Sequence, residues 1–165
     1  MRPTAVSTLN AQDGQSVSVV GDTYRILLSG QQTKGTHAII DMLIPPQGGP
    51  GPHAHAGIQE SFYVVEGEIE FKSESQTYSA GQGAFVNIPL GGAVHSFKNK
   101  TDQLAHLICV VVPAGLDEFF TEIGEPVESG TFLTPSPMTP EKQKQLEEIA
   151  KRYGQELFPP DYFNS

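Results

Sequence analysis

Short runs rich in β-branched and aromatic residues follow one another along most of the chain, separated by glycine, asparagine, aspartate and serine. Within a run, apolar and polar residues alternate, as they do on a strand that buries one face. Many short strands at this spacing are typical of an antiparallel sandwich or barrel. We therefore expect an all-β fold with strands over residues 16–20, 23–29, 36–44, 61–65, 68–72, 76–79, 84–88, 94–99 and 104–112.

The alternation also predicts which side chains face the interior. In residues 36–44 every second residue from Ala38 onward is apolar, so that face turns inward. In residues 94–99 the small and charged side chains share one face, which leaves the other face to His95, Phe97 and Asn99. A histidine directed into a barrel requires an explanation.

After the last long strand the hydrophobic period becomes helical. Residues 116–123 carry apolar side chains at i, i+3, i+4 and i+7, which predicts a short amphipathic helix that Gly124 ends. Thr139 and Pro140 are typical of the cap and first turn of a second helix, which has its own apolar stripe and ends at Gly154. Because such stripes usually pack on a core, we expect both helices against the barrel rather than as a lid.

These elements predict one domain in three parts. Residues 1–14 form an N-terminal arm, residues 15–113 the barrel, and residues 114–165 the helices and a tail packed on the barrel. Residues 125–138, with their prolines, are expected to form a surface linker. Gly67 can adopt positive φ, so we expect a tight hairpin between the two strands that flank it.

Composition narrows the possible partners. The chain has 10 basic and 19 acidic residues, a net charge of -9, which disfavours nucleic acids and anionic membranes. The single cysteine, Cys109, excludes an internal disulfide and is expected to be a small apolar strand residue. The first residues lack the apolar run of a signal peptide, and no stretch has the length of a membrane span, so a cytoplasmic location is expected.

Candidate chemistry is concentrated in residues 45–67, where a Pro/Gly-rich loop leads to His53, His55 and Glu60. Residues two apart on a strand share a face, so the two imidazoles can be directed at one common atom. A closed antiparallel barrel can bring the strand of His95 beside them. Three neutral imidazoles and a carboxylate suit one divalent first-row transition metal ion, with positions left for water, substrate or dioxygen.

Two stretches that contain these residues resemble the two motifs of the cupin superfamily, over about residues 16–113. The motif G-x5-H-x-H-x3-4-E-x6-G is matched by His53, His55, Glu60 and Gly67. The motif G-x5-P-x-G-x2-H-x3-N is matched by Gly83, Pro89, Gly92, His95 and Asn99. The glycine before His53 and the Pro89 to Gly92 spacing each depart by one residue, in turns. The phrases GDTYRILLSG, ESFYVVEGE, AGLDEFF and RYGQELFPP look similar to small single-domain cupins of the quercetin dioxygenase-like type.

The resemblance implies a double-stranded β-helix, or jelly-roll barrel, and an oxygenase chemistry. In such proteins an enol or enolate oxygen of the substrate binds the metal and dioxygen attacks the activated ring. By this resemblance His53, His55 and His95 hold the ion, which could be Fe, Mn, Ni, Cu or Zn. Glu60 is either the fourth ligand or the catalytic acceptor of the substrate hydroxyl proton. A flavonol-like enolic or phenolic compound is the expected substrate.

Two other functions remain open, because cupins also include sensors and isomerases. One is a non-catalytic metal-containing barrel that binds or senses a small molecule. The other is a metal-dependent isomerase of a sugar derivative, which would require basic residues for a phosphate that the inward positions do not supply. A homodimer formed through sheet edges is a further expectation from the family.

The remaining assignments follow from the face of the strand on which each residue lies. Phe62, Val64 and Phe97 share a face with Glu60 or His95, so they are expected to line the substrate pocket, although a filled core would use the same residues. His37 and His106 are interpreted as ordinary strand histidines. Asn99 is expected to brace a turn by hydrogen bonds.

Overall fold

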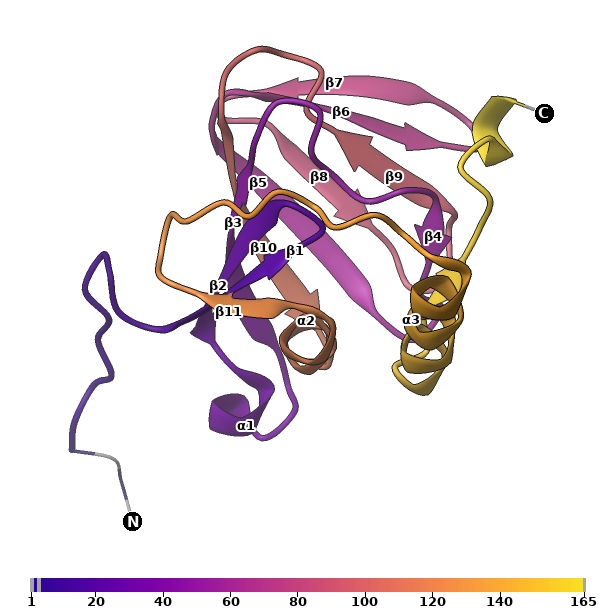
Figure 1. Ribbon diagram of the computed structural model, residues 1–165. Helices are drawn as coiled ribbons and strands as arrows, with labels where there is room; N and C mark the ends of the chain where they lie inside the picture. The colour runs from indigo at the N-terminus through magenta and orange to yellow at the C-terminus, as the bar shows by residue number, and fades with distance from the viewer. Residues whose placement is uncertain (1, 3, 165) are drawn as a thin grey trace.

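The computed structural model describes residues 2 and 4–164, which fold into two facing antiparallel sheets (Figure 1). Met1 and Pro3 of the expected arm and Ser165 of the expected tail lie outside the described residues. The first sheet has the order β11 (Glu125–Val127), β1 (Gln15–Val19), β2 (Asp22–Leu28), β3 (Ala38–Ile44), β10 (Ala105–Val112), β5 (Gln59–Glu66), β8 (Phe85–Ile88). The second has the order β12 (Glu156–Leu157), β4 (His53–Ala54), β9 (His95–Lys98), β6 (Glu68–Ser73), β7 (Thr77–Gly81).

The core lies between the two sheets, where the alternation predicted it. Ala38, Ile40 and Ile44 on β3 are fully buried, and Met42 is 1% exposed. On β9 the interior face carries His95, Phe97 and Asn99. The all-β jelly-roll prediction is confirmed.

Every predicted strand is present, and both of its ends lie within two residues of the prediction. Three short strands were not predicted. The expected linker begins with β11, which pairs with β1 through Ser16 and Val127. The strands β4 and β12 pair with each other across a long separation in sequence. A strand of two or three residues carries no alternation, so periodicity could not predict these three.

The hairpin expected at Gly67 is wrong. β5 pairs with β10 and β8, whereas β6 pairs with β7 and β9, so the chain crosses from one sheet to the other at this residue. Gly67 has φ of 78°, and a Cβ there would lie 2.7 Å from the carbonyl oxygen of Leu104. Glycine is therefore required for a sheet-to-sheet corner that passes against β10.

The two predicted helices form where the pattern placed them, whereas a short helix before β3 was not predicted. A short α1 (Gly30–Thr33) precedes β3, α2 (Leu116–Ile123) follows the barrel, and α3 (Pro140–Arg152) begins after Thr139, whose hydroxyl accepts a hydrogen bond from the Lys142 amide. α3 and β12 lie beside β4 at one end of the barrel, and the described residues end in a 3-10 helix, η1 (Tyr162–Asn164) (Figure 1). Among the described residues, no helix is both long and apolar enough to cross a membrane.

Candidate metal centre

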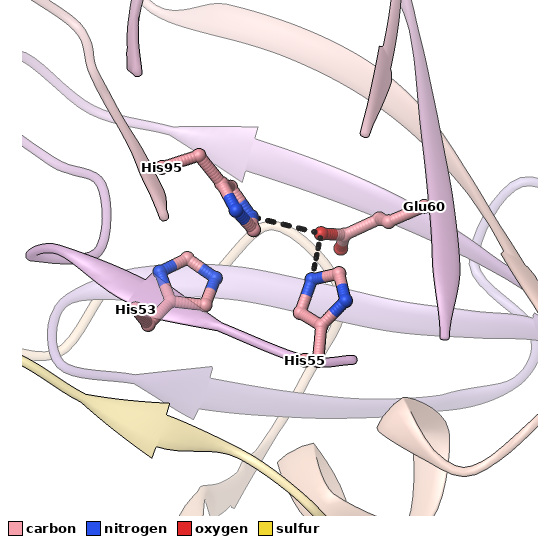
Figure 2. A group of neighbouring side chains, drawn as sticks. All are labelled: His53, His55, Glu60 and His95. Atoms are coloured by element: carbon pink, nitrogen blue, oxygen red, sulfur yellow. Dashed lines mark hydrogen bonds and ion pairs between the residues drawn. The ribbon is translucent and has the colours of Figure 1, made fainter. Parts of the chain in front are cut away.

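Four side chains from both sheets meet at one point inside the barrel (Figure 2). β4 and β9 pair so that His53 lies opposite His95, and His55 follows directly after β4. Glu60 reaches the same point from β5 of the other sheet. One ligand atom from each of the four lies within 4.8 Å of all the others.

Backbone carbonyls orient the three imidazoles. The Nδ1 atoms of His53, His55 and His95 each lie 2.9 Å from a carbonyl oxygen, of Gly51, Ile58 and Ala93 respectively. A carbonyl oxygen only accepts, so each Nδ1 carries the proton and donates it. The Nε2 lone pairs are left free, and a metal-ligating histidine is commonly held in this way.

The Nε2 atoms gather around the Glu60 carboxylate. Glu60 Oε2 lies 3.1 Å from Nε2 of His55 and 3.6 Å from Nε2 of His95. His95 Nε2 is buried and has no hydrogen-bond partner among the described residues. A buried polar atom without a partner is costly, and a bound cation would satisfy it. The donor set and this unpaired atom therefore fit a divalent transition metal ion.

The electrostatics of the cluster agree with that role. Burial and the neighbouring His95 lower the pKa of His53 to about 4, so this imidazole is neutral near pH 7. Burial raises the pKa of Glu60, but the neighbouring imidazoles of His55 and His95 outweigh it and hold the pKa well below its usual range. Burial lowers the pKa of His55, yet Glu60 outweighs this and raises it. Glu60 is thus an ionised carboxylate that attracts positive charge.

Cys109 is a neighbour of the cluster that sequence reasoning missed. It is a buried residue of β10, as expected, but its Sγ donates to Glu60 Oε1 at 3.2 Å. Burial and the Glu60 carboxylate raise the pKa of this thiol well above its ordinary value. Cys109 is therefore a neutral donor that holds the second oxygen of Glu60.

Two residues of the cluster, His53 and Glu60, line a cavity of about 520 Å³. Phe97 lines it as well, together with apolar side chains from α2, α3 and the C-terminal tail. Phe62 and Val64 are not among its lining residues: both are fully buried, and Phe62 packs against Phe71 and Phe97. Both side chains face inward as predicted, but they lie deeper in the core than the cavity. Alternation along a strand predicts the face of the sheet on which a side chain lies, but not its position along the barrel.

The structure also places the other histidines and Asn99. His106 contacts Asp41 and His37 lies beside the Thr36 hydroxyl, and neither belongs to the cluster. The Asn99 amide donates to the carbonyls of Ile44 and Gln103, and its oxygen accepts from Thr101. Asn99 thus braces the turn after β9.

Sequence reasoning also missed Asp22 and Tyr24, two polar residues of β2 that line the cavity. Asp22 is 2% exposed and Tyr24 is 3% exposed. A signal was present, because Asp22, Tyr24 and the apolar Ile26 share one face of the strand. The predicted strand began one residue after Asp22, so the residue was not assigned a face.

Comparison with known proteins agrees with this fold and site. Residues 40–111 match the family described as the Cupin domain. Quercetin 2,3-dioxygenase of Bacillus subtilis (strain 168) is 24% identical over 124 residues, which cover 75% of this chain and 36% of that protein's length.

Two solved structures share the fold at low identity. KdgF from Halomonas sp. superposes with a TM-score of 0.59 and 16% identity, over 70% of this chain and 99% of that one. The polyketide cyclase RemF from Streptomyces resistomycificus superposes with a TM-score of 0.57 and 17% identity, over 87% of this chain and 92% of that one. A cupin domain is thus matched at residues 40–111, within the jelly-roll barrel that holds the His and Glu cluster.

Proposed function

We propose that this protein is a metal-dependent oxygenase that acts on a small enolic or phenolic compound of the flavonol type. The observation that carries the proposal is the cluster of three imidazoles and Glu60, of which His53 and Glu60 line a largely apolar cavity. The similarity to quercetin 2,3-dioxygenase over 75% of the chain supports the same class of substrate. When bound, a divalent cation would stabilise the negative charge of an enolate oxygen.

The cavity has the size and lining for a flat aromatic molecule. Its volume of about 520 Å³ falls within the range of roughly 300–1,000 Å³ typical of small-molecule sites. Phe97 of β9 and Phe119 and Phe120 of α2 supply aromatic walls. Such walls exclude water from the reacting atoms and hold a planar ring by packing.

Glu60 is the residue that we propose accepts the substrate proton. Its carboxylate is 3% exposed and lines the cavity. An enol or phenol hydroxyl is more acidic than a simple alcohol, so a carboxylate within hydrogen-bond reach accepts its proton more readily. Cys109 would keep the carboxylate oriented through the hydrogen bond to Oε1.

The lining disfavours the isomerase alternative. Among its described residues the cavity wall has no lysine or arginine, whereas Asp22, Glu60 and Glu147 contribute acidic groups. A phosphorylated sugar would be repelled by these carboxylates and would find no guanidinium or ammonium partner. A neutral aromatic substrate fits this wall better.

Dioxygen consumption tests the proposal. The metal-free protein would be loaded separately with iron, manganese, nickel, copper or zinc and supplied with a panel of flavonols and enolic diketones. We expect oxygen uptake in a fixed ratio to substrate consumed, with both oxygen atoms entering the product. Glu60→Gln should reduce the rate while the three histidines remain. Tight binding of these compounds without turnover by any metal form would instead favour a binding or sensing barrel.

A further inference from the structure

The cavity holds a second polar group besides the metal cluster. Asp22 and Tyr24 lie on β2, and β3 and β10 separate this strand from the β5 strand of Glu60 in the sheet. Both residues line the same cavity as His53 and Glu60. A ligand that fills the cavity therefore meets polar atoms at two places, with apolar side chains between them.

The two side chains are hydrogen-bonded to each other and retain unused capacity. The Tyr24 hydroxyl donates to Asp22 Oδ2 at 3.0 Å, and the Gly49 amide donates to Asp22 Oδ1 at 3.2 Å. Because the single phenolic proton is directed at Asp22, the lone pairs of the Tyr24 oxygen remain as acceptors. Burial raises the pKa of Asp22 to about 7, against hydrogen bonds from Tyr24 and Gly49 that lower it.

The surroundings fix this pair in place. The Tyr24 ring packs edge-on against Phe120, with ring centroids 4.9 Å apart. Close to Asp22, a Cβ on Gly48 would lie only 2.3 Å from Oδ1, so the loop before His53 approaches the carboxylate as only glycine allows. A pair held from both sides in this way is preorganised, and preorganised polar groups bind a ligand without a further ordering cost.

We propose that Asp22 and Tyr24 form a binding subsite for a hydroxyl group on the substrate, placed apart from the enol that is directed at the metal cluster. The inference rests on the proposed function, because it assumes that the enolic end lies at His53 and Glu60. It narrows the substrate class to neutral aromatic compounds with at least one further ring hydroxyl. This hydroxyl donates a hydrogen bond to the free lone pairs of Asp22 and Tyr24. An apolar ring in this position would leave both groups without a ligand partner.

The experiment uses the zinc-loaded protein, because zinc has no redox chemistry and binding is measured without turnover. The probes are 3-hydroxyflavone and two analogues with one more hydroxyl, 3,7-dihydroxyflavone and 3,4′-dihydroxyflavone. Flavonols absorb at longer wavelengths than the aromatic side chains of the protein, so their absorbance reports binding. We expect the wild type to bind one of the two analogues about tenfold more tightly than 3-hydroxyflavone.

Tyr24→Phe should remove this preference and leave the affinity for 3-hydroxyflavone within about twofold of the wild type. Asp22→Asn is the second variant, since it keeps the shape of the side chain, and it should reduce the preference as well. Tyr78→Phe is the matched control, because Tyr78 lies on β7, is 48% exposed and does not line the cavity. Zinc content and thermal midpoint are measured for each variant.

The outcomes separate the two claims. If wild-type protein binds 3-hydroxyflavone but shows no preference for either analogue, the subsite is wrong and the proposed function stands. If Tyr24→Phe and Asp22→Asn weaken all three ligands equally, the pair only supports the fold and the subsite is again wrong. If the zinc form binds none of the flavonols, the proposed function fails and the subsite fails with it.

Discussion

The barrel has two groups of histidines and carboxylates, one inside and one outside, and their surroundings differ. Outside, Asp41 receives hydrogen bonds from Arg25 through Nε and a terminal nitrogen, at 3.0 and 2.6 Å, and its other oxygen contacts His106. Inside, the Glu60 carboxylate meets imidazoles and the Cys109 thiol, and His95 Nε2 has no hydrogen-bond partner among the described residues.

The difference shows what makes the inner group a candidate metal site and the outer group an ion pair. Arg25 supplies a permanent positive charge to Asp41, so the outer group is complete without a cation. The inner group has converging lone pairs and a carboxylate but no permanent cation. Histidine and a carboxylate in contact are therefore not enough. The convergence of unprotonated nitrogens, each fixed by a carbonyl on its other side, is the informative feature.

Removal of inner ligands should have the largest effect. The double variant His53→Ala, His55→Ala leaves two of the four donors, so we expect loss of stoichiometric metal and of all oxygenase activity. Elemental analysis of purified protein measures the metal, and circular dichroism confirms the fold. His37→Ala is the matched control, since His37 lies outside the cluster, and it should retain the metal. Metal content unchanged in the double variant would refute the ligand assignment.

Asp22 is a carboxylic acid buried inside the barrel with no cation beside it among the described residues, so its ionisation should destabilise the fold. The pKa of Asp22 rises from 3.8 in the unfolded chain to about 7 in the folded protein. Its stabilising contribution to the free energy of unfolding is therefore fully present below the unfolded pKa and is lost as the pH rises through the folded pKa. Relative to wild type, Asp22→Asn should therefore gain about 2–4 kcal/mol of unfolding free energy between about pH 4 and pH 8. Urea denaturation across this range measures the gain, and a pH-independent difference would contradict it.

Disruption of the outer group should cost stability and leave the metal in place. Arg25→Met removes both hydrogen bonds to the nearly buried Asp41, for a loss of about 2 kcal/mol of unfolding free energy, since His106 still pairs with the carboxylate. Metal content and oxygen uptake should equal those of the wild type. A loss of metal in this variant would mean that the two groups are coupled, which breaks the comparison.

Loosening the inner carboxylate should have the smallest effect. Cys109→Ala removes the thiol that donates to Glu60 Oε1, so we expect a loss of metal affinity of about three- to tenfold with the same stoichiometry. Competition with a chromophoric chelator measures the affinity. Cys109→Ser, which keeps a donor, should recover most of the loss, and an equal loss in both variants would assign the effect to packing.

The sequence predicted the residues of the cluster because the evidence for them is local. His53 and His55 share a strand face, and His95 lies on the interior face of its own strand together with Phe97. The pairing of the two strands is a long-range contact that no local pattern reports. The strand order of the jelly roll provides this contact by placing His53 opposite His95.

The parts that the sequence did not predict depend on contacts between distant segments. Gly67 has the dihedral angle of a turn, but which strands pair on either side of it depends on β8, β9 and β10. β12 exists only because β4 is beside it. Asp22 is buried because the Gly49 loop and Tyr24 satisfy its oxygens, a condition that no period in the sequence reports.

The most direct test of the metal centre is anomalous diffraction from crystals of the protein loaded with a single metal, collected on both sides of that metal's absorption edge. The account predicts one strong anomalous peak per chain, within about 2.0–2.3 Å of Nε2 of His53, His55 and His95 and in contact with a Glu60 oxygen. A peak at another position, or no peak in protein that carries stoichiometric metal in solution, would contradict it.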